Sequence, residues 1–200
     1  TPPGFGTNKF YVSTYCVVDN QLVSPCPIIT NAITTNLNTE GALFVNYTGH
    51  GSTYYWASGP TVFSRTNVDA LTNGSRLPVV LSWTCLDGFF YYPVRTDRTT
   101  QNTPSLVETW LLSSGKGAVA TFSPSGLGVG TGHDILASGF YDSIFRDGNW
   151  DLGAASISAK IKLYSTGLFL DLINSYSIFG DPALRLSSPY RMQVSPDTLA

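Results

Sequence analysis

Gly41-Ala-Leu-Phe-Val-Asn-Tyr-Thr-Gly-His-Gly-Ser52 and Leu77-Pro-Val-Val-Leu-Ser-Trp-Thr-Cys85 are the two stretches that decide the fold. Each is an apolar, β-prone run that stops at a polar loop, the first at His50 and the second at Cys85. Apolar runs bounded by glycine favour central strands of a parallel sheet that is covered on both faces. Neighbouring parallel strands deliver their C-terminal ends to one edge, which is where open α/β sheets bind ligands. We therefore expect His50 and Cys85 to lie side by side in one cleft.

The remaining segments extend this α/β pattern along the chain. The spacing of apolar residues predicts helices over 28–37, 66–73, 104–115, 133–145 and 152–164, with further strands over 118–122 and 176–186. A short strand is expected at 10–15 and an irregular aromatic segment at 52–65. Strands that alternate with helices predict an α/β fold with a mainly parallel sheet flanked by helices.

Composition excludes several classes of function. Charged residues make up only 12% of the 200 residues, and the net charge is −2 with no basic run, so a nucleic-acid partner is not expected. No apolar stretch approaches 18 residues, so we expect no membrane span. The first residues, Thr-Pro-Pro, indicate a processed or excised piece. One domain over residues 1–186 is expected, and 187–200 reads as a linker or the start of another domain.

The three cysteines suggest two roles. Cys16 and Cys26 are ten residues apart in a polar segment, and a disulfide between them would leave Cys85 as the unpaired thiol. The alternative is that all three are free and that Cys85 is a small core residue. No Cys-x-x-Cys motif or Cys/His cluster is present, so a zinc site is not expected.

A cysteine nucleophile needs a base, and the sequence offers only two histidines. His50 lies between two glycines, which permit close substrate approach, and Gly51 offers a backbone N–H for an oxyanion. His133 opens a predicted helix, so a structural or loop-ordering role is favoured for it. The alternative for His50 is a turn residue without a catalytic role. A neighbouring imidazolium would stabilise a cysteine thiolate at neutral pH, which favours a Cys85–His50 pair.

Two further motifs carry less weight. The run Gly126-Leu-Gly-Val-Gly-Thr-Gly132 has neither dinucleotide-binding nor phosphate-loop spacing, and a flexible loop that walls a cleft is favoured. Asn46-Tyr-Thr48 matches a glycosylation site, but we expect Asn46 in a buried strand and regard this match as chance.

With these residues in view, the chain resembles the gingipain-like cysteine peptidases. The histidine block Asn46–Ser52 and the cysteine block Leu77–Cys85 with Gly88 and Phe89 are similar to those of the family. The resemblance continues, in order, through Ser105–Glu108, Gly117–Ala120 with Ser123, Leu152–Ala155 with Ala159-Lys160, and Phe179–Leu184.

This resemblance implies a caspase-like, three-layer α/β fold and a cysteine endopeptidase. In that reading Cys85 is the nucleophile, His50 is the base, and the backbone N–H groups of Gly51 and Cys85 form the oxyanion hole. The partner is a protein or peptide substrate. A preceding segment of the same precursor is a further candidate partner, because elements that the family carries before the histidine block are reduced here.

No cofactor is expected, although a structural calcium ion is left open. A secreted or cell-surface, bacterial-type protein is expected. Two alternatives stand: a sortase-like transpeptidase of the same family, and a catalytically silent adhesion or assembly module. A small-molecule site at the 126–132 loop is a more distant alternative. The residue preference of the substrate is not predicted.

Overall fold

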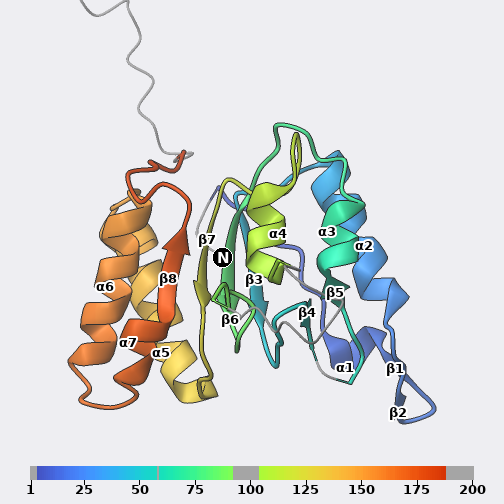
Figure 1. Cartoon of the computed structure of the whole chain (residues 1–200), viewed down its shortest axis with the longest axis horizontal. Helices are drawn as coiled ribbons and strands as arrows, with labels where there is room; N and C mark the ends of the chain where they lie inside the picture. The colour runs from blue at the N-terminus through green and yellow to red at the C-terminus, as the bar shows by residue number, and fades with distance from the viewer. Residues whose placement is uncertain (1–3, 58, 92–103, 188–200) are drawn as a thin grey trace, which may run out of the picture.

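A four-stranded sheet organises the chain in the computed structural model, which describes residues 4–57, 59–91 and 104–187 (Figure 1). Its strands are β3 (Phe44–Thr48), β6 (Val79–Trp83), β7 (Ala120–Pro124) and β8 (Tyr176–Phe179), in the order β3-β6-β7-β8. The β3–β6 and β6–β7 pairs are parallel, and β8 is antiparallel to β7. The expectation of an α/β fold with a mainly parallel sheet is therefore confirmed.

Helices cover both faces of this sheet. On one side lie α2 (Pro27–Thr39), α3 (Arg65–Asp69) and α4 (Leu106–Leu112) (Figure 1). On the other side lie α5 (Gly130–Tyr141), its π-helical continuation η1 (Asp142–Arg146), α6 (Leu152–Tyr164) and α7 (Asp171–Ser175). The sheet is thus the middle of three layers.

Alternation along β6 divides the core between the two faces. Val79, Leu81 and Trp83 pack with α5 and α6, whereas Val80 packs with α2, α3 and α4. Because strand side chains point alternately to opposite faces, one fully buried strand contributes to two hydrophobic cores. This explains why its sequence is a continuous apolar run.

The helices begin where local capping favours them, although the predicted starts of α3, α4 and α5 shift. Ser105 caps α4 by accepting from the Glu108 N–H at 3.2 Å, so the helix begins two residues after its predicted start at 104. Ser64 caps α3, which begins one residue before its predicted start at 66. The α5 helix begins three residues before His133, because Gly130 and Gly132 are part of its first turn. The prediction of a helix over 152–164 is confirmed by α6.

Three local predictions are wrong. Residues 10–15 contain a short helix, α1 (Val12–Tyr15), rather than a strand, and this is followed by the small hairpin β1 (Val17–Val18) and β2 (Gln21–Leu22). The segment 52–65 is not irregular, because β4 (Tyr55–Trp56) and β5 (Phe63–Ser64) form a second hairpin. In both places the sequence has no clear hydrophobic period. Strand pairing and the packing of aromatic side chains determine the structure there.

The third wrong prediction concerns β3, which is not a central strand. Within the described residues it pairs only with β6, and its side chains are half-buried or exposed. Asn46 is exposed, and its Oδ1 accepts hydrogen bonds from Trp83 Nε1 at 2.6 Å and Tyr141 Oη at 2.7 Å. The apolar run reflects contacts with helices on both faces, which an edge strand also makes.

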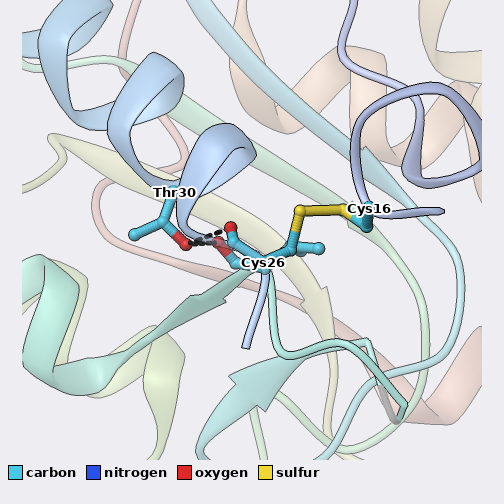
Figure 2. Close-up of a disulfide and its surroundings, with 4 residues drawn as sticks. Cys16, Cys26 and Thr30 are labelled. Atoms are coloured by element: carbon cyan, nitrogen blue, oxygen red, sulfur yellow. Dashed lines mark hydrogen bonds between the residues drawn. A yellow bond between two sulfur atoms is a disulfide. The ribbon is translucent and has the colours of Figure 1, made fainter. Parts of the chain in front are cut away.

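A disulfide joins Cys16 to Cys26, with the Cα atoms 5.4 Å apart (Figure 2). It is buried and lies at the start of α2, where Thr30 Oγ1 donates to the Cys26 carbonyl at 3.1 Å and to the Val62 carbonyl at 2.7 Å. The Cys26 N–H donates to Thr61 O at 3.1 Å. The predicted pairing is therefore confirmed, and it ties the N-terminal segment to the loop that connects β4 and β5.

The predicted linker over 187–200 lies outside the described residues apart from Ser187. Across the described ranges, no helix combines the length and the hydropathy needed to cross a bilayer.

Candidate functional site

The register of the sheet brings the His50 and Cys85 loops together. Thr48 at the end of β3 is paired with Trp83 at the end of β6. His50 and Cys85 each follow two residues later, so the two loops leave neighbouring parallel strands at equivalent positions. A hydrogen bond from Gly49 N to Trp83 O at 3.3 Å extends the pairing into the loops.

Gly51 packs directly against the Thr84 side chain and the Cys85 carbonyl group in the neighbouring loop. A Cβ atom at this position would collide with Thr84 Oγ1 and would lie 3.0 Å from the Cys85 carbonyl oxygen. Among the described residues, neither the Gly51 nor the Cys85 N–H donates to a backbone carbonyl. An oxyanion-binding site requires N–H donors that are not already paired with backbone carbonyls.

The backbone of His50 is held from two sides. Its carbonyl accepts hydrogen bonds from Tyr47 Oη at 2.5 Å and from Ala57 N at 2.7 Å. The Tyr47 ring is stacked on Trp56 with the centroids 4.7 Å apart, and burial raises the pKa of the Tyr47 phenol. This turn therefore has a fixed backbone, while the His50 side chain is exposed to solvent.

Cys85 is the one free cysteine, and it is partly exposed. Its Sγ donates to Gly128 O at 3.5 Å, and the next residue donates from Leu86 N to Gly126 O at 3.0 Å. Leu86 has a positive φ of 62°, which a non-glycine residue adopts only where its surroundings require it. The loop after β7 thus packs against the Cys85 turn, and the prediction that it is flexible and walls a cleft stays a prediction.

His133 packs against Gly128 of this loop. A Cβ atom at Gly128 would collide with His133 Nε2, and the His133 ring is 5.7 Å from the ring of Tyr176. Burial lowers the pKa of His133, and the neighbouring Asp134 opposes this shift. A buried histidine that favours its neutral form and supports a loop fits the predicted structural role.

Sequence reasoning missed Asp87, two residues after Cys85. Its side chain is buried and its Oδ2 accepts from Trp56 Nε1 at 2.9 Å. Burial raises the pKa of Asp87 to about 7, and the hydrogen bond from Trp56 opposes the shift. The pair Asp87-Gly88 resembles an ordinary turn, so the only signal in the sequence was a carboxyl group close to the candidate nucleophile.

A groove of 1630 Å³ follows the outer side of β3 and is lined by residues from the N-terminal segment, α2, β3 and η1. His50 contributes to its lining, whereas Cys85 does not. The structure therefore shows the two loops in contact but does not show both side chains opening into this groove. In the described part of the chain, no cluster of three or more His, Cys, Asp or Glu residues could hold a metal ion.

A free cysteine and a histidine thus follow the ends of two adjoining parallel strands of an α/β sheet. Residues 1–187 match the model of peptidase family C25, and the chain belongs to this family.

Known relatives agree with this assignment. The chain is 30% identical over 172 residues to gingipain R2 of Porphyromonas gingivalis strain W83, covering 78% of this chain and 21% of that protein. A segment of 52 residues, 26% of this chain and 5% of that protein, is 42% identical to gingipain R1 of Porphyromonas gingivalis. The chain thus spans about a fifth or less of the length of these curated relatives.

Solved structures show the same fold. The crystal structure of the Arg-specific cysteine proteinase gingipain R has a TM-score of 0.68 at 22% identity, over 86% of this chain and 38% of that one. A complex of the RgpB pro- and mature domains of Porphyromonas gingivalis has a TM-score of 0.65 at 22% identity, with the same coverage. The three-layer arrangement around the mainly parallel sheet is therefore that of the gingipains.

Proposed function

We propose that this chain carries the nucleophile and base of a cysteine endopeptidase with a caspase-like fold, spanning residues 1–186. The observation that carries this proposal is the equivalent position of His50 and Cys85 beyond the paired ends of two parallel strands. Gly51 packs on the Thr84 side chain and the Cys85 carbonyl group. Membership of peptidase family C25 supports the same reaction class.

The proposed mechanism uses side chains and backbone N–H groups of this chain alone and needs no cofactor. His50 removes the proton from the Cys85 thiol, and the thiolate attacks the carbonyl carbon of the peptide bond. The N–H groups of Gly51 and Cys85 donate to the oxyanion of the tetrahedral intermediate. His50 then protonates the leaving amine, which leaves an acyl thioester on Cys85. A water molecule deprotonated by His50 hydrolyses the thioester and restores the thiol.

Two alternatives keep the same site. In a transpeptidase, an amine of a second chain takes the acyl group from Cys85 in place of water. In a silent adhesion or assembly module, the fold is kept without turnover. The partly exposed, unpaired thiol of Cys85 favours an active site over a silent one.

The buried disulfide supports the proposal of a secreted or cell-surface protein, since such bonds persist mainly in oxidising compartments. A protein or peptide is the proposed substrate. A preceding segment of the precursor is a proposed partner, which the solved complex of pro- and mature domains of a relative supports. A structural calcium ion remains a proposal without support in the described residues.

The test compares the full-length protein with its Cys85→Ala, His50→Ala and His133→Ala variants. Cleavage of a peptide library and the rate of iodoacetamide labelling are measured. Loss of Cys85 or His50 is expected to lower turnover by at least about 100-fold, as general acid–base catalysis contributes 10²–10⁴-fold. His133→Ala is expected to affect mainly KM, because His133 only supports the Gly128 loop.

The outcomes separate the alternatives. Labelling without cleavage, and transfer of the acyl group to an added amine, would identify a transpeptidase. A folded wild-type protein with neither activity, whose Cys85 labels no faster than a free thiol, would support the silent module. Equal losses in the two histidine variants would contradict the choice of His50.

A further inference from the structure

Asp87 connects the Cys85 turn to a second part of the fold. Its carboxyl group is fully buried, and its Oδ2 accepts the indole N–H of Trp56, 31 residues earlier in the chain, at 2.9 Å. Its backbone carbonyl accepts from Val107 N at 3.0 Å, which anchors the turn to α4. The next residue, Gly88, donates to Pro124 O at 2.9 Å. The turn that carries Cys85 is therefore held by hydrogen bonds at Asp87 and at Gly88.

Trp56 belongs to the hairpin that holds the other loop. It forms a β-bridge with Gly51, flanked by hydrogen bonds from Ala57 N to His50 O at 2.7 Å and from Ser52 N to Tyr55 O at 3.0 Å. Its ring is 1% exposed and is packed among Tyr47, Phe63 and Trp110, with centroid distances of 4.7, 5.7 and 6.2 Å. This packing holds the Trp56 ring so that its indole N–H points to the Asp87 carboxyl group.

Together these contacts form a continuous connection. The Cys85 turn is joined through the Asp87 carboxyl group to the Trp56 indole, and Trp56 is joined through the β-bridge to Gly51 beside His50. Building on the proposed function, we propose that Asp87 is a positioning residue whose hydrogen bond with Trp56 sets the Cys85 turn relative to the His50–Gly51 loop. The carboxyl group acts through the two loops and does not touch the substrate.

The groups around Asp87 determine how readily its carboxyl group ionises. The titratable groups that face it are Tyr47 from β3 and Tyr176 from β8, and Cys85 lies on its own turn. Next to Tyr176 lies His133, whose pKa is lowered by burial. No cationic side chain offsets the carboxylate among the groups that shift its pKa. Burial without a cationic partner raises the pKa of this carboxyl group to about 7, and the hydrogen bond from Trp56 opposes the shift.

The experiment uses four variants of the full-length protein. Asp87→Asn keeps an oxygen that accepts from Trp56 but cannot ionise. Asp87→Ala and Trp56→Phe each remove one partner of the bond. Asn73→Ala is the matched control, because Asn73 is also buried and also joins two loops, bonding Arg76 and Gly117 before β6 and β7, at the opposite end of the sheet.

We expect Asp87→Ala and Trp56→Phe each to lower kcat and the labelling rate of Cys85 by about tenfold, the effect of one lost buried hydrogen bond on alignment. Asp87→Asn should stay within about threefold of the wild type at pH 6, since it keeps the bond. The wild-type pH profile should contain an ionisation near pH 7 that is missing in Asp87→Asn. Asn73→Ala should lower stability while leaving the profile unchanged.

The failure of this inference differs from the failure of the proposed function. If Cys85→Ala retains turnover, the proposed function is wrong, and the Cys85 labelling rates still test the Asp87–Trp56 connection. If Cys85→Ala is inactive but Asp87→Ala and Trp56→Phe label and turn over like the wild type, the positioning role is overturned. A drop in Asp87→Asn equal to that in Asp87→Ala would also overturn it, because the acceptor oxygen would then not be what matters.

Discussion

At the residue scale, Gly51 is packed too closely to carry a side chain in this structure. The absence of a side chain lets its backbone approach Thr84 Oγ1 and the Cys85 carbonyl oxygen, and this approach sets the spacing of the two loops. The sequence has a glycine on each side of His50, which predicts close approach of a substrate. The structure adds that Gly51 is needed for contact rather than for flexibility.

Gly51→Ala is therefore expected to displace the His50 loop and to lower kcat/KM by at least about tenfold, since catalytic geometry is sensitive to shifts of about 1 Å. Adding Thr84→Ala removes the hydroxyl and methyl groups that the new Cβ would meet, so the double variant should recover part of the loss. Turnover of the single and double variants measures this recovery. If Thr84→Ala brings no recovery in the Gly51→Ala background, the collision with Thr84 is not the cause.

At the scale of elements, the disulfide separates the roles of the cysteines. The Cys16–Cys26 bond joins α1 to the start of α2, and Cys26 in turn bonds the β4–β5 connection through Thr61. In the native protein we expect alkylation of one thiol, that of Cys85. After reduction and unfolding, all three cysteine thiols should be alkylated.

Replacing both Cys16 and Cys26 by Ser should lower the free energy of unfolding by roughly 2–3 kcal/mol, the value for closing a loop of this length. Denaturant titration of the oxidised wild type and the double variant gives the difference. The reduced wild type is the control, and it should behave like the variant. A reduced wild type as stable as the oxidised protein would show that the bond contributes nothing to stability.

The elements also show where sequence reasoning reached its limit. The runs before His50 and Cys85 were predicted as adjacent parallel strands, because apolar period and glycine boundaries are local signals, and β3 and β6 confirm this pairing. The β4–β5 hairpin was missed because its strands have two residues each, too short for a period to show. Trp56 could then not be placed, nor could its hydrogen bond with Asp87.

At the scale of the whole molecule, the two-sided sheet was predictable but the place of β3 within it was not. A strand packed by helices on both faces has the same apolar sequence at the edge as in the centre, and only strand order distinguishes the two cases. The burial of Asp87 could not be predicted from the sequence for a related reason. Its burial depends on β4, α4 and the turn after β7, which come from three distant parts of the chain.

Burial of Asp87 also makes the stability of the whole protein depend on pH. In the unfolded chain an aspartate ionises near its ordinary pKa of about 4, whereas burial raises the pKa of Asp87 in the folded protein to about 7. Between these values the folded state binds more protons than the unfolded state, so the free energy of unfolding falls as pH rises. The slope from this one group is at most about 1.4 kcal/mol per pH unit.

Asp87→Asn removes this dependence while keeping the acceptor for Trp56. The variant should therefore gain stability relative to the wild type as the pH rises from 4.5 to 7.5, measured by denaturant unfolding at several pH values. Asp142→Asn is the control: the hydrogen bond from Lys162 lowers the pKa of Asp142, so its contribution is present above the unfolded pKa and is lost only as the pH falls through the lower, folded value. Its difference from the wild type should thus stay constant over the same range. A difference between Asp87→Asn and the wild type that is also constant from pH 4.5 to 7.5 would mean that Asp87 is ionised in the folded protein throughout.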